Sequence, residues 1–332
     1  MKAFVTGATG FVGAHITRAL LERGATVRCL ARESSRLDLL ERLPIDVVRG
    51  DLTDAPSLRR GIEGTDAVFH CAADYRLYVP DPAAMYAANV EGTRNVLRVS
   101  AESGVDRVVY TSTVGALGLA ATGRSADETT PARLAGMTGH YKRSKFLAER
   151  VADEWIERGL PLVVVNPSAP VGEMDVKPTA TGRMILDFLE GKMGAYVDTG
   201  LNLVDVRDVA EGHLLALEKG RVGEKYILGN ENLTLEQILQ KLAAITGRPA
   251  PRVRLPHWVP LTVSALDTWR ARLFKRVPRF PLDAVRLARY KMFFDAGKAV
   301  RELGLPQTPV DEALSRAVDW FRTHGYVKGK AA

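Results

Sequence analysis

The chain opens with Met1-Lys-Ala-Phe-Val-Thr-Gly-Ala-Thr-Gly-Phe-Val-Gly13, and this stretch decides the fold. The short run Lys2–Thr6 is rich in apolar and β-branched residues, which is typical of a strand. From Phe11 to Arg23 the apolar residues recur at helical spacing, and Gly24 follows as a stop signal. A glycine-rich turn therefore joins a predicted strand to a predicted helix at the start of the sequence.

The three glycines of this turn meet different requirements. Gly7 permits the tight turn, Gly10 lets a ligand approach the backbone, and Gly13 lets helix and strand pack closely. Free N–H groups at the N-terminus of the helix favour a phosphate. The turn therefore predicts a site for a dinucleotide pyrophosphate, formed by Gly7, Thr9, Gly10, Phe11, Val12 and Gly13.

The first half of the chain continues this alternation of strand and helix. Predicted strands are Thr26–Ala31, Asp46–Arg49, Ala67–His70, Arg107–Thr111 and Leu162–Asn166, and predicted helices are Ala55–Ile62, Ala83–Ser103 and His140–Arg158. Strands that alternate with helices form parallel βαβ units, and continuous apolar strands indicate helices on both faces of the sheet. The sequence therefore predicts an α/β fold, a Rossmann doubly wound parallel sheet.

The alternation stops after Pro167, where proline and glycine become frequent and short strands mix with helices. We predict a dinucleotide-binding domain over residues 1–167 and a smaller α+β substrate lobe over residues 168–330. The segment 201–215 is expected to return to the first domain.

Composition narrows the class of protein. Apolar residues make up 46% of the chain and charged residues 26%, as in soluble globular proteins. The two cysteines, Cys29 and Cys71, lie in strand-like runs and do not form a disulfide framework. No signal peptide and no apolar run of membrane-spanning length is evident, which favours a cytoplasmic protein. No spacing of histidine, cysteine and carboxylate residues indicates a metal site.

The net charge of +7 is concentrated in one region. Between Arg248 and Arg301 there are 13 Lys or Arg residues and 3 Asp residues. Such a region suits an anionic lipid surface or a phosphorylated substrate, or it is a solvated face. We predict no nucleic-acid partner, and the sequence leaves peripheral membrane contact and a homodimer open.

The end of the second predicted strand distinguishes two cofactors. An acidic residue there binds the ribose 2′-hydroxyl of NAD, whereas an arginine accepts the 2′-phosphate of NADP. The run Arg32-Glu-Ser-Ser-Arg36 favours NADP through Arg32 and Arg36, and NAD is the alternative because Glu33 is acidic. After the third strand, Asp51 and Leu52 are expected beside the adenine, where the carboxylate can accept from the amino group.

The segment Gly139-His-Tyr-Lys-Arg-Ser-Lys145 carries the predicted chemistry. Tyr141 and Lys145 lie one helical turn apart and share a face. A phenol has a pKa of about 10, and a nearby ammonium lowers that value, so Tyr141 can transfer a proton near neutral pH. Tyr110-Thr-Ser-Thr113 ends a strand at the carboxyl edge of the sheet, where ligands bind, and supplies a hydroxyl for the substrate oxygen.

These segments resemble the extended short-chain dehydrogenase/reductase family over nearly the whole chain. Further matching segments are Gly50-Asp-Leu52, Phe69-His-Cys-Ala-Ala73, Asn89-Val-Glu-Gly-Thr93, Asn166-Pro-Ser168 and Val204-Asp-Val-Arg-Asp-Val-Ala210. The resemblance implies a Ser/Thr–Tyr–Lys centre in which Thr113 holds the hydroxyl position and Ser112 is the alternative. It also implies that Asn89 lies near the active site.

The same resemblance implies two further sets of contacts. Cofactor contacts are expected from Cys71, Ala72, Ala73, Tyr141, Lys145, Pro167 and Ser168. Substrate contacts are expected from Asp74, Tyr75, Thr113, Tyr141 and Asn166.

Three segments resemble a narrower group, the hopanoid-associated sugar epimerases, close to the dihydroflavonol-4-reductase-like branch. They are His70-Cys-Ala-Ala-Asp-Tyr-Arg-Leu-Tyr-Val-Pro-Asp-Pro82, Gly139–Lys145 and Ala195-Tyr-Val-Asp-Thr-Gly-Leu-Asn-Leu-Val204. The resemblance implies either an NADP-dependent reductase or an epimerase with tightly bound NAD, acting on a small-molecule or lipid-linked sugar or polyol. A non-catalytic NADP-binding regulator is the alternative of another class, and the intact pair Tyr141 and Lys145 argues against it.

The stretch Leu255–Phe274 interleaves apolar, aromatic and basic residues. Two interpretations remain open for it. It is a core helix of the second lobe with a basic outer face, or it faces lipid at a headgroup boundary.

Overall fold

The computed structural model describes residues 1–332 except 121–123, 275, 277, 279–280 and 328–332. Lys275 of the basic region and the last residues of the predicted substrate lobe thus lie outside the described residues.

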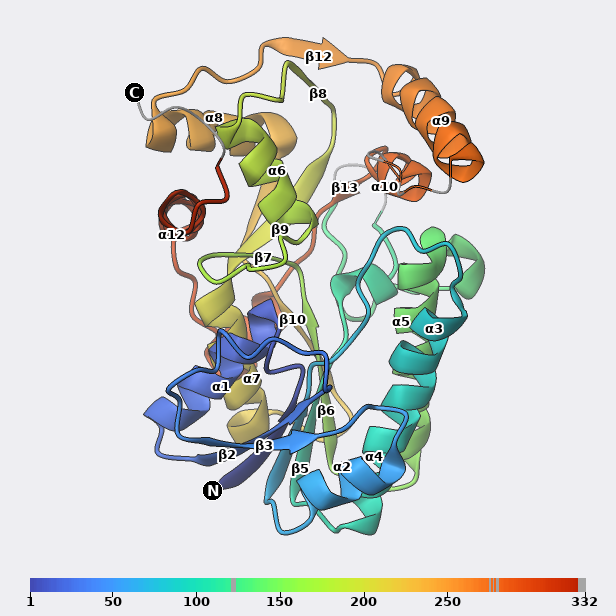
Figure 1. Cartoon of the computed structure of the whole chain (residues 1–332), viewed down its shortest axis with the longest axis vertical. Coiled ribbons are helices and arrows are strands. Elements are labelled where there is room, and N and C mark those ends of the chain that lie inside the picture. Colours follow the sequence, from blue (N-terminus) through green and yellow to red (C-terminus); the bar gives the residue numbers. More distant parts are fainter. Residues whose placement is uncertain (121–123, 275, 277, 279–280, 328–332) are drawn as a thin grey trace.

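Seven parallel strands form the main sheet in the order β10-β6-β5-β4-β1-β2-β3 (Figure 1). Their bounds are β1 Lys2–Thr6, β2 Thr26–Ala31, β3 Ile45–Arg49, β4 Ala67–His70, β5 Arg107–Thr111, β6 Leu162–Pro167 and β10 Lys225–Leu228. The order from β3 to β6 is that of the doubly wound dinucleotide-binding sheet. The predicted fold class is confirmed. Strand β10 was not predicted, because a long segment of the other lobe separates it from β6 along the chain.

Helices cover both faces of this sheet, as the apolar strands require (Figure 1). Helices α1 (Phe11–Glu22) and α7 (Val206–Lys219) pack on each other at one face, with α11 (Gly297–Leu303) beside α7. Helices α2 (Ala55–Ile62), α4 (Gly92–Glu102) and α5 (Gly139–Glu157) cover the other. Within residues 201–215, α7 thus lies against the main sheet domain, whereas strand β9 (Gly200–Asp205) lies in a smaller sheet.

The segment predicted as one helix, Ala83–Ser103, is interrupted. It consists of α3 (Ala83–Tyr86), a π-helical segment η1 (Ala87–Glu91) and α4. A π-helical segment inserts a residue into the helical repeat and is frequent at functional sites. Helical spacing alone did not predict it, because the apolar pattern continues through the insertion.

The second lobe lies at the top of Figure 1, where the chain leaves β6. Strand β9 pairs with β7 (Ala169–Val171), β11 (Glu231–Thr234) and β13 (Lys291–Met292), and β8 (Ala195–Val197) pairs with β12 (Val253–Leu255). The helices of this lobe are α6 (Ala180–Leu189), α8 (Leu235–Thr246), α9 (Trp258–Leu273), α10 (Leu282–Leu287) and α12 (Val310–Thr323). Earlier in the chain, two short 3₁₀ turns lie between β5 and α5, namely η2 (Val114–Ala116) and η3 (Leu134–Gly136). Helices α6, α8 and α12 share one apolar core with this sheet. The lobe therefore sits over the carboxyl edge of the main sheet.

Candidate active site

The glycine turn has no room for side chains. Gly7 has φ +80°, and a Cβ on it would lie 2.7 Å from the backbone nitrogen of Ala72. A Cβ on Gly13 would lie 2.2 Å from the Gly7 carbonyl oxygen. Gly10 caps α1 without a side-chain hydrogen bond, so the N–H groups of the first turn remain available. This cradle fits a dinucleotide pyrophosphate, and Thr9, Phe11 and Val12 are partly exposed beside it.

The loop after β4 forms the neighbouring wall. Cys71 N–H donates to the Thr6 carbonyl oxygen at 3.2 Å, and Ala72 N–H donates to Thr6 Oγ1 at 3.2 Å. These bonds hold Cys71 and Ala72 directly against Gly7, and Ala73 follows them in the same loop. Burial raises the pKa of the Cys71 thiol to about 12, so the thiol stays protonated.

The two arginines after β2 have different surroundings. Arg32 is exposed at the strand end, and its carbonyl accepts from Arg49 Nη1 at 2.8 Å and from Ser35 N–H. Arg36 forms an ion pair with Asp38, and the charges of both reach Tyr326 near the C-terminus. Arg32 thus follows a strand whose Leu30 pairs with Thr6, directly before the glycine turn, whereas the Arg36 side chain is paired with Asp38.

On the adenine side, Asp51 follows β3. Its Oδ1 accepts from the backbone N–H of Thr53 at 3.0 Å and from Thr53 Oγ1 at 2.8 Å. Leu52 is buried against Gly92, where a Cβ would lie 2.8 Å from Leu52 Cβ. Leu52 thus anchors the loop, and Asp51 is partly exposed at its start.

The reaction centre forms where β5 and α5 meet. Thr113 follows β5, and its Oγ1 accepts from Gly115 N–H at 3.1 Å, which caps the short helix η2. Burial raises the pKa of the Tyr141 phenol, and a hydrogen bond with the Thr113 side chain partly offsets this. The side chains of these two residues, which come from distant segments, therefore lie close together at the carboxyl edge of the sheet.

Lys145 is buried one turn after Tyr141. Its ammonium donates to the Tyr110 hydroxyl at 2.9 Å and to the Thr111 carbonyl oxygen at 2.8 Å. Burial lowers the pKa of Lys145 to about 8, although the charge of Glu149 opposes this. The sequence predicted a lowered pKa for Tyr141, whereas the structure gives a raised one. Burial of the phenol is the larger effect, and the Lys145 ammonium donates its hydrogen bonds to Tyr110 and Thr111 of β5.

Glu149 continues the face of α5 that carries Tyr141 and Lys145, and the sequence analysis missed it. Its carboxylate is buried and accepts from Ser112 Oγ at 2.5 Å, Asn166 Nδ2 at 3.0 Å and Lys225 Nζ at 2.6 Å. Burial raises its pKa, but the ion pair with Lys225 and these hydrogen bonds outweigh burial and hold the pKa below its ordinary value. The four-residue spacing from Lys145 was the available signal.

This network separates the two candidate hydroxyls. Ser112 is turned inward to Glu149, whereas Thr113 lies beside Tyr141. Asn166 connects both, because its Nδ2 donates to the Thr113 carbonyl oxygen at 3.1 Å and to Glu149. Glu149 therefore supports the strand ends that present Thr113.

Asn89 belongs to the π-helical segment. Its Oδ1 accepts from Asp74 N–H at 2.7 Å, and its Nδ2 donates to the Asp74 carbonyl oxygen and to Ser144 Oγ, both at 2.9 Å. Asn89 thus ties the loop after β4 to α5. The Asp74 carboxylate pairs with Arg76, and the Tyr75 hydroxyl donates to the Lys177 carbonyl oxygen at 3.3 Å.

Two buried polar atoms near the end of β6 have no hydrogen-bond partner in the described part of the chain. They are Asn166 Oδ1 and Ser168 Oγ, on either side of Pro167. Buried polar groups are nearly always hydrogen-bonded, so such atoms mark a place where a polar ligand fits. Together with the glycine cradle, they fit a nicotinamide dinucleotide.

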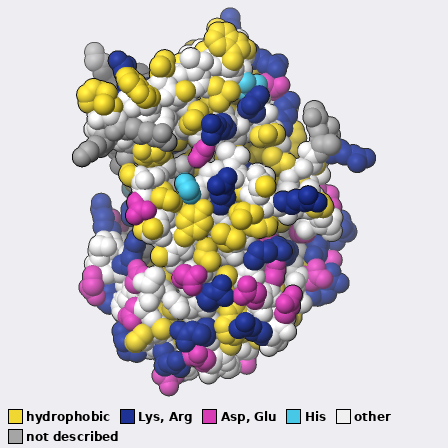
Figure 2. Space-filling view, turned by 90° about the vertical axis from the view of Figure 1, so that its right-hand side faces the viewer, with side chains coloured by type: hydrophobic (Ala, Val, Ile, Leu, Met, Phe, Trp, Pro, Cys, Tyr) yellow, Lys and Arg dark blue, Asp and Glu magenta, His cyan; other side chains and the backbone are white. Residues whose placement is uncertain are grey.

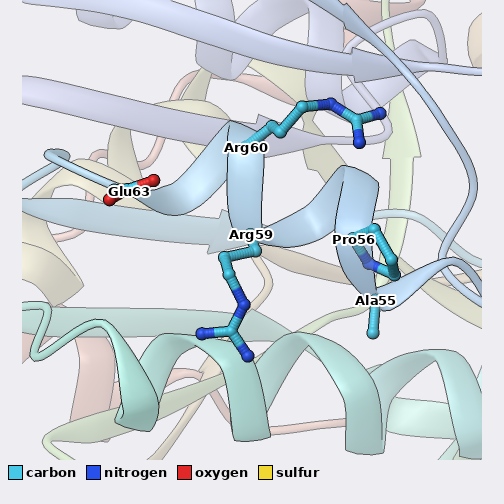
Figure 3. Close-up of a pocket in the computed structure, with 5 residues that line it drawn as sticks. All are labelled: Ala55, Pro56, Arg59, Arg60 and Glu63. Atoms are coloured by element: carbon cyan, nitrogen blue, oxygen red, sulfur yellow. The ribbon is translucent and has the colours of Figure 1, made fainter.

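A shallow hollow of about 340 Å³ lies elsewhere, on α2, lined by Ala55, Pro56, Arg59, Arg60 and Glu63 (Figure 3). Arg59 points toward the neighbouring helix, where it pairs with Glu102. None of the site residues described above lines this hollow, so we assign no function to it.

Lys142 is a second buried cation that the sequence analysis missed. Its Nζ has only the Met292 thioether at 3.9 Å as a described acceptor, and a thioether is a weak one. A Cβ built on Gly115 would lie 3.5 Å from Lys142 Cε and 3.4 Å from Thr113 Oγ1. Lys142 therefore lies beside the reaction centre. Burial lowers its pKa from the ordinary value of 10.5 to about 8.

Replacing Lys142 by methionine is expected to raise the free energy of unfolding at pH 7 by up to about 3 kcal/mol, from the pKa difference. Between pH 8 and 10.5 Lys142 is deprotonated in the folded protein but still protonated in the unfolded one, so the free energy of unfolding of the wild type rises with pH. The stability difference between the variant and the wild type is therefore expected to disappear over this range. Urea denaturation across this pH range measures the effect. Lys177→Met on the exposed surface is the control, and an equal gain there would contradict the assignment.

A family model described as the NAD dependent epimerase/dehydratase family matches residues 3–229. A protein of Synechocystis sp. provisionally named dihydroflavonol 4-reductase is 49% identical, over 98% of this chain and 96% of its own length. Sterol demethylase protein B of Methylococcus capsulatus is 38% identical, over 98% of this chain and 100% of its own length.

A solved structure, the crystal structure of gox2253, has a TM-score of 0.88 and 46% identity, covering 98% of this chain and 99% of the other. The similarity extends over the glycine turn, the reaction centre and the second lobe, because both chains are covered almost completely. The chain therefore belongs to the NAD-dependent epimerase/dehydratase family, the extended short-chain dehydrogenase/reductases.

Proposed function

We propose that the protein is an NADP-dependent oxidoreductase that reduces a carbonyl group on a sugar or polyol substrate. The observation that carries this proposal is the proximity of the Thr113 hydroxyl to the Tyr141 phenol at the carboxyl edge of the sheet. When bound, the reduced cofactor supplies a hydride to the carbonyl carbon. Tyr141 then donates a proton to the carbonyl oxygen, and Thr113 orients that oxygen.

The surroundings of Tyr141 suit a proton donor. Its pKa is raised by burial, which keeps the phenol protonated at neutral pH. Lys145 is buried one turn away with a pKa of about 8, so its charge is still present at pH 7. An ammonium at that distance along the helix stabilises the phenolate that remains after proton donation.

Two relatives support a reductase acting on an amphiphilic substrate. One carries a reductase name and the other a sterol-demethylation name. We therefore infer that the sugar or polyol is joined to an apolar polycyclic group, as in a hopanoid. An epimerase that keeps NAD bound is the second candidate, because the family model describes epimerases and dehydratases.

The nucleotide released from purified protein distinguishes the two. Denaturation followed by chromatography is expected to release little nucleotide, and the native protein is expected to bind added NADPH. Stoichiometric release of NAD would instead support the epimerase. Binding of NADPH without turnover of any carbonyl substrate would support a regulator.

Replacing Arg32 by aspartate is expected to weaken NADPH binding about tenfold to 150-fold, with little effect on NADH. Arg32 is exposed at the end of β2, where an arginine accepts the 2′-phosphate through charge-assisted hydrogen bonds. Calorimetric titration of both cofactors into both proteins measures the effect.

Arg36→Asp is the matched control, because Arg36 is paired with Asp38 and its charge reaches Tyr326. Its affinities for both cofactors are expected to stay near wild type. Equal losses of NADH and NADPH affinity in Arg32→Asp would mean that Arg32 does not recognise the 2′-phosphate.

A further inference from the structure

Helix α9 presents its large side chains to solvent and its small ones to the protein. Ser264, Thr268 and Ala271 are buried, with exposed fractions of 0%, 9% and 1%. The exposed residues are Trp258 (68%), Val263 (49%), Leu266 (60%), Trp269 (64%), Leu273 (62%) and, just after the helix, Phe274 (69%). A surface helix of a globular protein usually buries its large apolar side chains, so the arrangement in α9 is the reverse. The interpretation of α9 as an apolar core helix is therefore wrong.

The exposed residues form one face. Leu266, Trp269 and Leu273 follow at intervals of three and four residues, which places them side by side on the helix. Single apolar residues at a surface need no explanation, but a contiguous apolar patch marks an interaction site. Figure 2 shows hydrophobic side chains gathered at the top of the molecule, with Lys and Arg side chains close to them.

Basic residues outnumber acidic ones in the sequence of this region. From Trp258 to Lys291 the sequence has eight Lys or Arg residues and two Asp residues. Both acidic residues are paired, Asp267 with Arg276 at 2.5 Å and Asp283 with Arg286 at 3.4 Å. Arg270 is exposed directly after Trp269. A partner for this face must therefore accept apolar side chains and carry negative charge.

We propose that the exposed face of α9 docks the protein on an anionic lipid bilayer. Aromatic and aliphatic side chains enter the boundary between headgroups and acyl chains, and flanking cations bind anionic headgroups. No helix among the described residues is long and apolar enough to cross a bilayer, so the contact is peripheral. A second copy of the chain fits less well, because a two-fold interface would bring two such basic regions together.

The position of α9 connects this contact to the reaction centre. Helix α9 packs on α10, and Asp283 of α10 lies at the start of α5, where a Cβ on Gly139 would lie 3.2 Å from Asp283 Oδ2. Tyr141 follows two residues later in α5. A bilayer against α9 would therefore lie on the side of the lobe that borders the catalytic helix, where a lipid-linked substrate could enter.

Flotation with phosphatidylcholine vesicles, with and without phosphatidylglycerol, tests the proposal. The full-length protein is expected to float with anionic vesicles at low ionic strength and to dissociate as salt is added. The double variant Trp269→Ser/Leu273→Ser is expected to bind at least about tenfold more weakly, because it removes two large apolar contacts. Arg270→Gln is expected to bind about fivefold more weakly, the contribution of one cation near an anionic surface.

Val222→Ser is the matched control, since Val222 is 50% exposed in the segment between α7 and β10, outside the basic region. It is expected to float like wild type, and all variants are expected to bind NADPH equally. Quenching of tryptophan fluorescence by brominated lipid, lost in the double variant, would support insertion of α9.

Three results would overturn the proposal. The first is no flotation at low ionic strength. The second is equal flotation of the double variant and Val222→Ser. The third is a concentration-dependent dimer in light scattering that the double variant abolishes, because the face would then be covered by a second copy. The experiment does not require the substrate, so its failure leaves the proposed reaction untouched.

Discussion

Replacing Tyr141 by phenylalanine is expected to lower kcat by about 10²–10⁴-fold, the usual contribution of general acid–base catalysis. The change removes the phenolic hydroxyl that lies beside the Thr113 side chain, but it keeps the ring and its packing. The glycine cradle and the loop after β4 are unaltered, so cofactor affinity is expected to stay near wild type. Steady-state kinetics and a separate cofactor titration distinguish the two effects.

Lys145→Ala is the companion variant. Its ammonium donates to the Tyr110 hydroxyl and the Thr111 carbonyl oxygen, and it lies in the region where the nicotinamide ribose is expected. Turnover and cofactor affinity are therefore both expected to fall. The assignment of Tyr141 as proton donor would be refuted if Tyr141→Phe kept kcat within about threefold of wild type, far less than proton transfer contributes.

Replacing Glu149 by leucine is expected to lower the free energy of unfolding by about 3 kcal/mol, because it removes a buried carboxylate and leaves the Lys225 ammonium with the longer ion pair to Asp153, at 3.3 Å. The carboxylate is also the acceptor for Ser112 and Asn166, so both side chains lose a hydrogen bond. Since Asn166 also donates to the Thr113 carbonyl oxygen, kcat is expected to fall as well. Urea denaturation and kinetics measure the two losses.

The pH dependence of this loss follows from the pKa of Glu149. The folded-state pKa lies below the ordinary glutamate value of 4.5, so the stabilisation is fully present above that pH. It is lost as the pH falls through the lower folded-state value, and the gap between wild type and Glu149→Leu is expected to narrow in acid.

Two further variants test the cause of the loss. Glu154→Leu is the control on the same helix, because Glu154 forms an exposed ion pair with Arg94 and such pairs contribute at most about 1 kcal/mol. The double variant Glu149→Leu/Lys225→Met is expected to be more stable than Glu149→Leu alone, because it no longer leaves a largely buried ammonium that has lost the nearer of its two carboxylates. A double variant less stable than the single one would contradict the role given to the ion pair.

Local sequence pattern was sufficient to predict six of the seven strands of the main sheet. The strand β1, the glycine turn and helix α1 depend on contacts between near neighbours, and short-range spacing records such contacts directly. The same holds for Tyr141 and Lys145, because residues four apart in a helix share a face in any helix. Strand β10 was not predicted, because its partner β6 is distant in sequence and its own apolar run is short.

The α/β class, the position of the glycine turn and the shared helix face of Tyr141 and Lys145 can all be predicted from local sequence pattern. Which side chains are removed from water, and which groups they contact, depends on how distant segments pack together. Ser112 and Thr113 are adjacent, yet one faces Glu149 and the other Tyr141. Burial raises the pKa of Tyr141 although the sequence predicts a lowering. Helix α9 is apolar in sequence, but its neighbours cover its small residues and leave its tryptophans in solvent, because spacing defines the faces of a helix and only packing chooses between them.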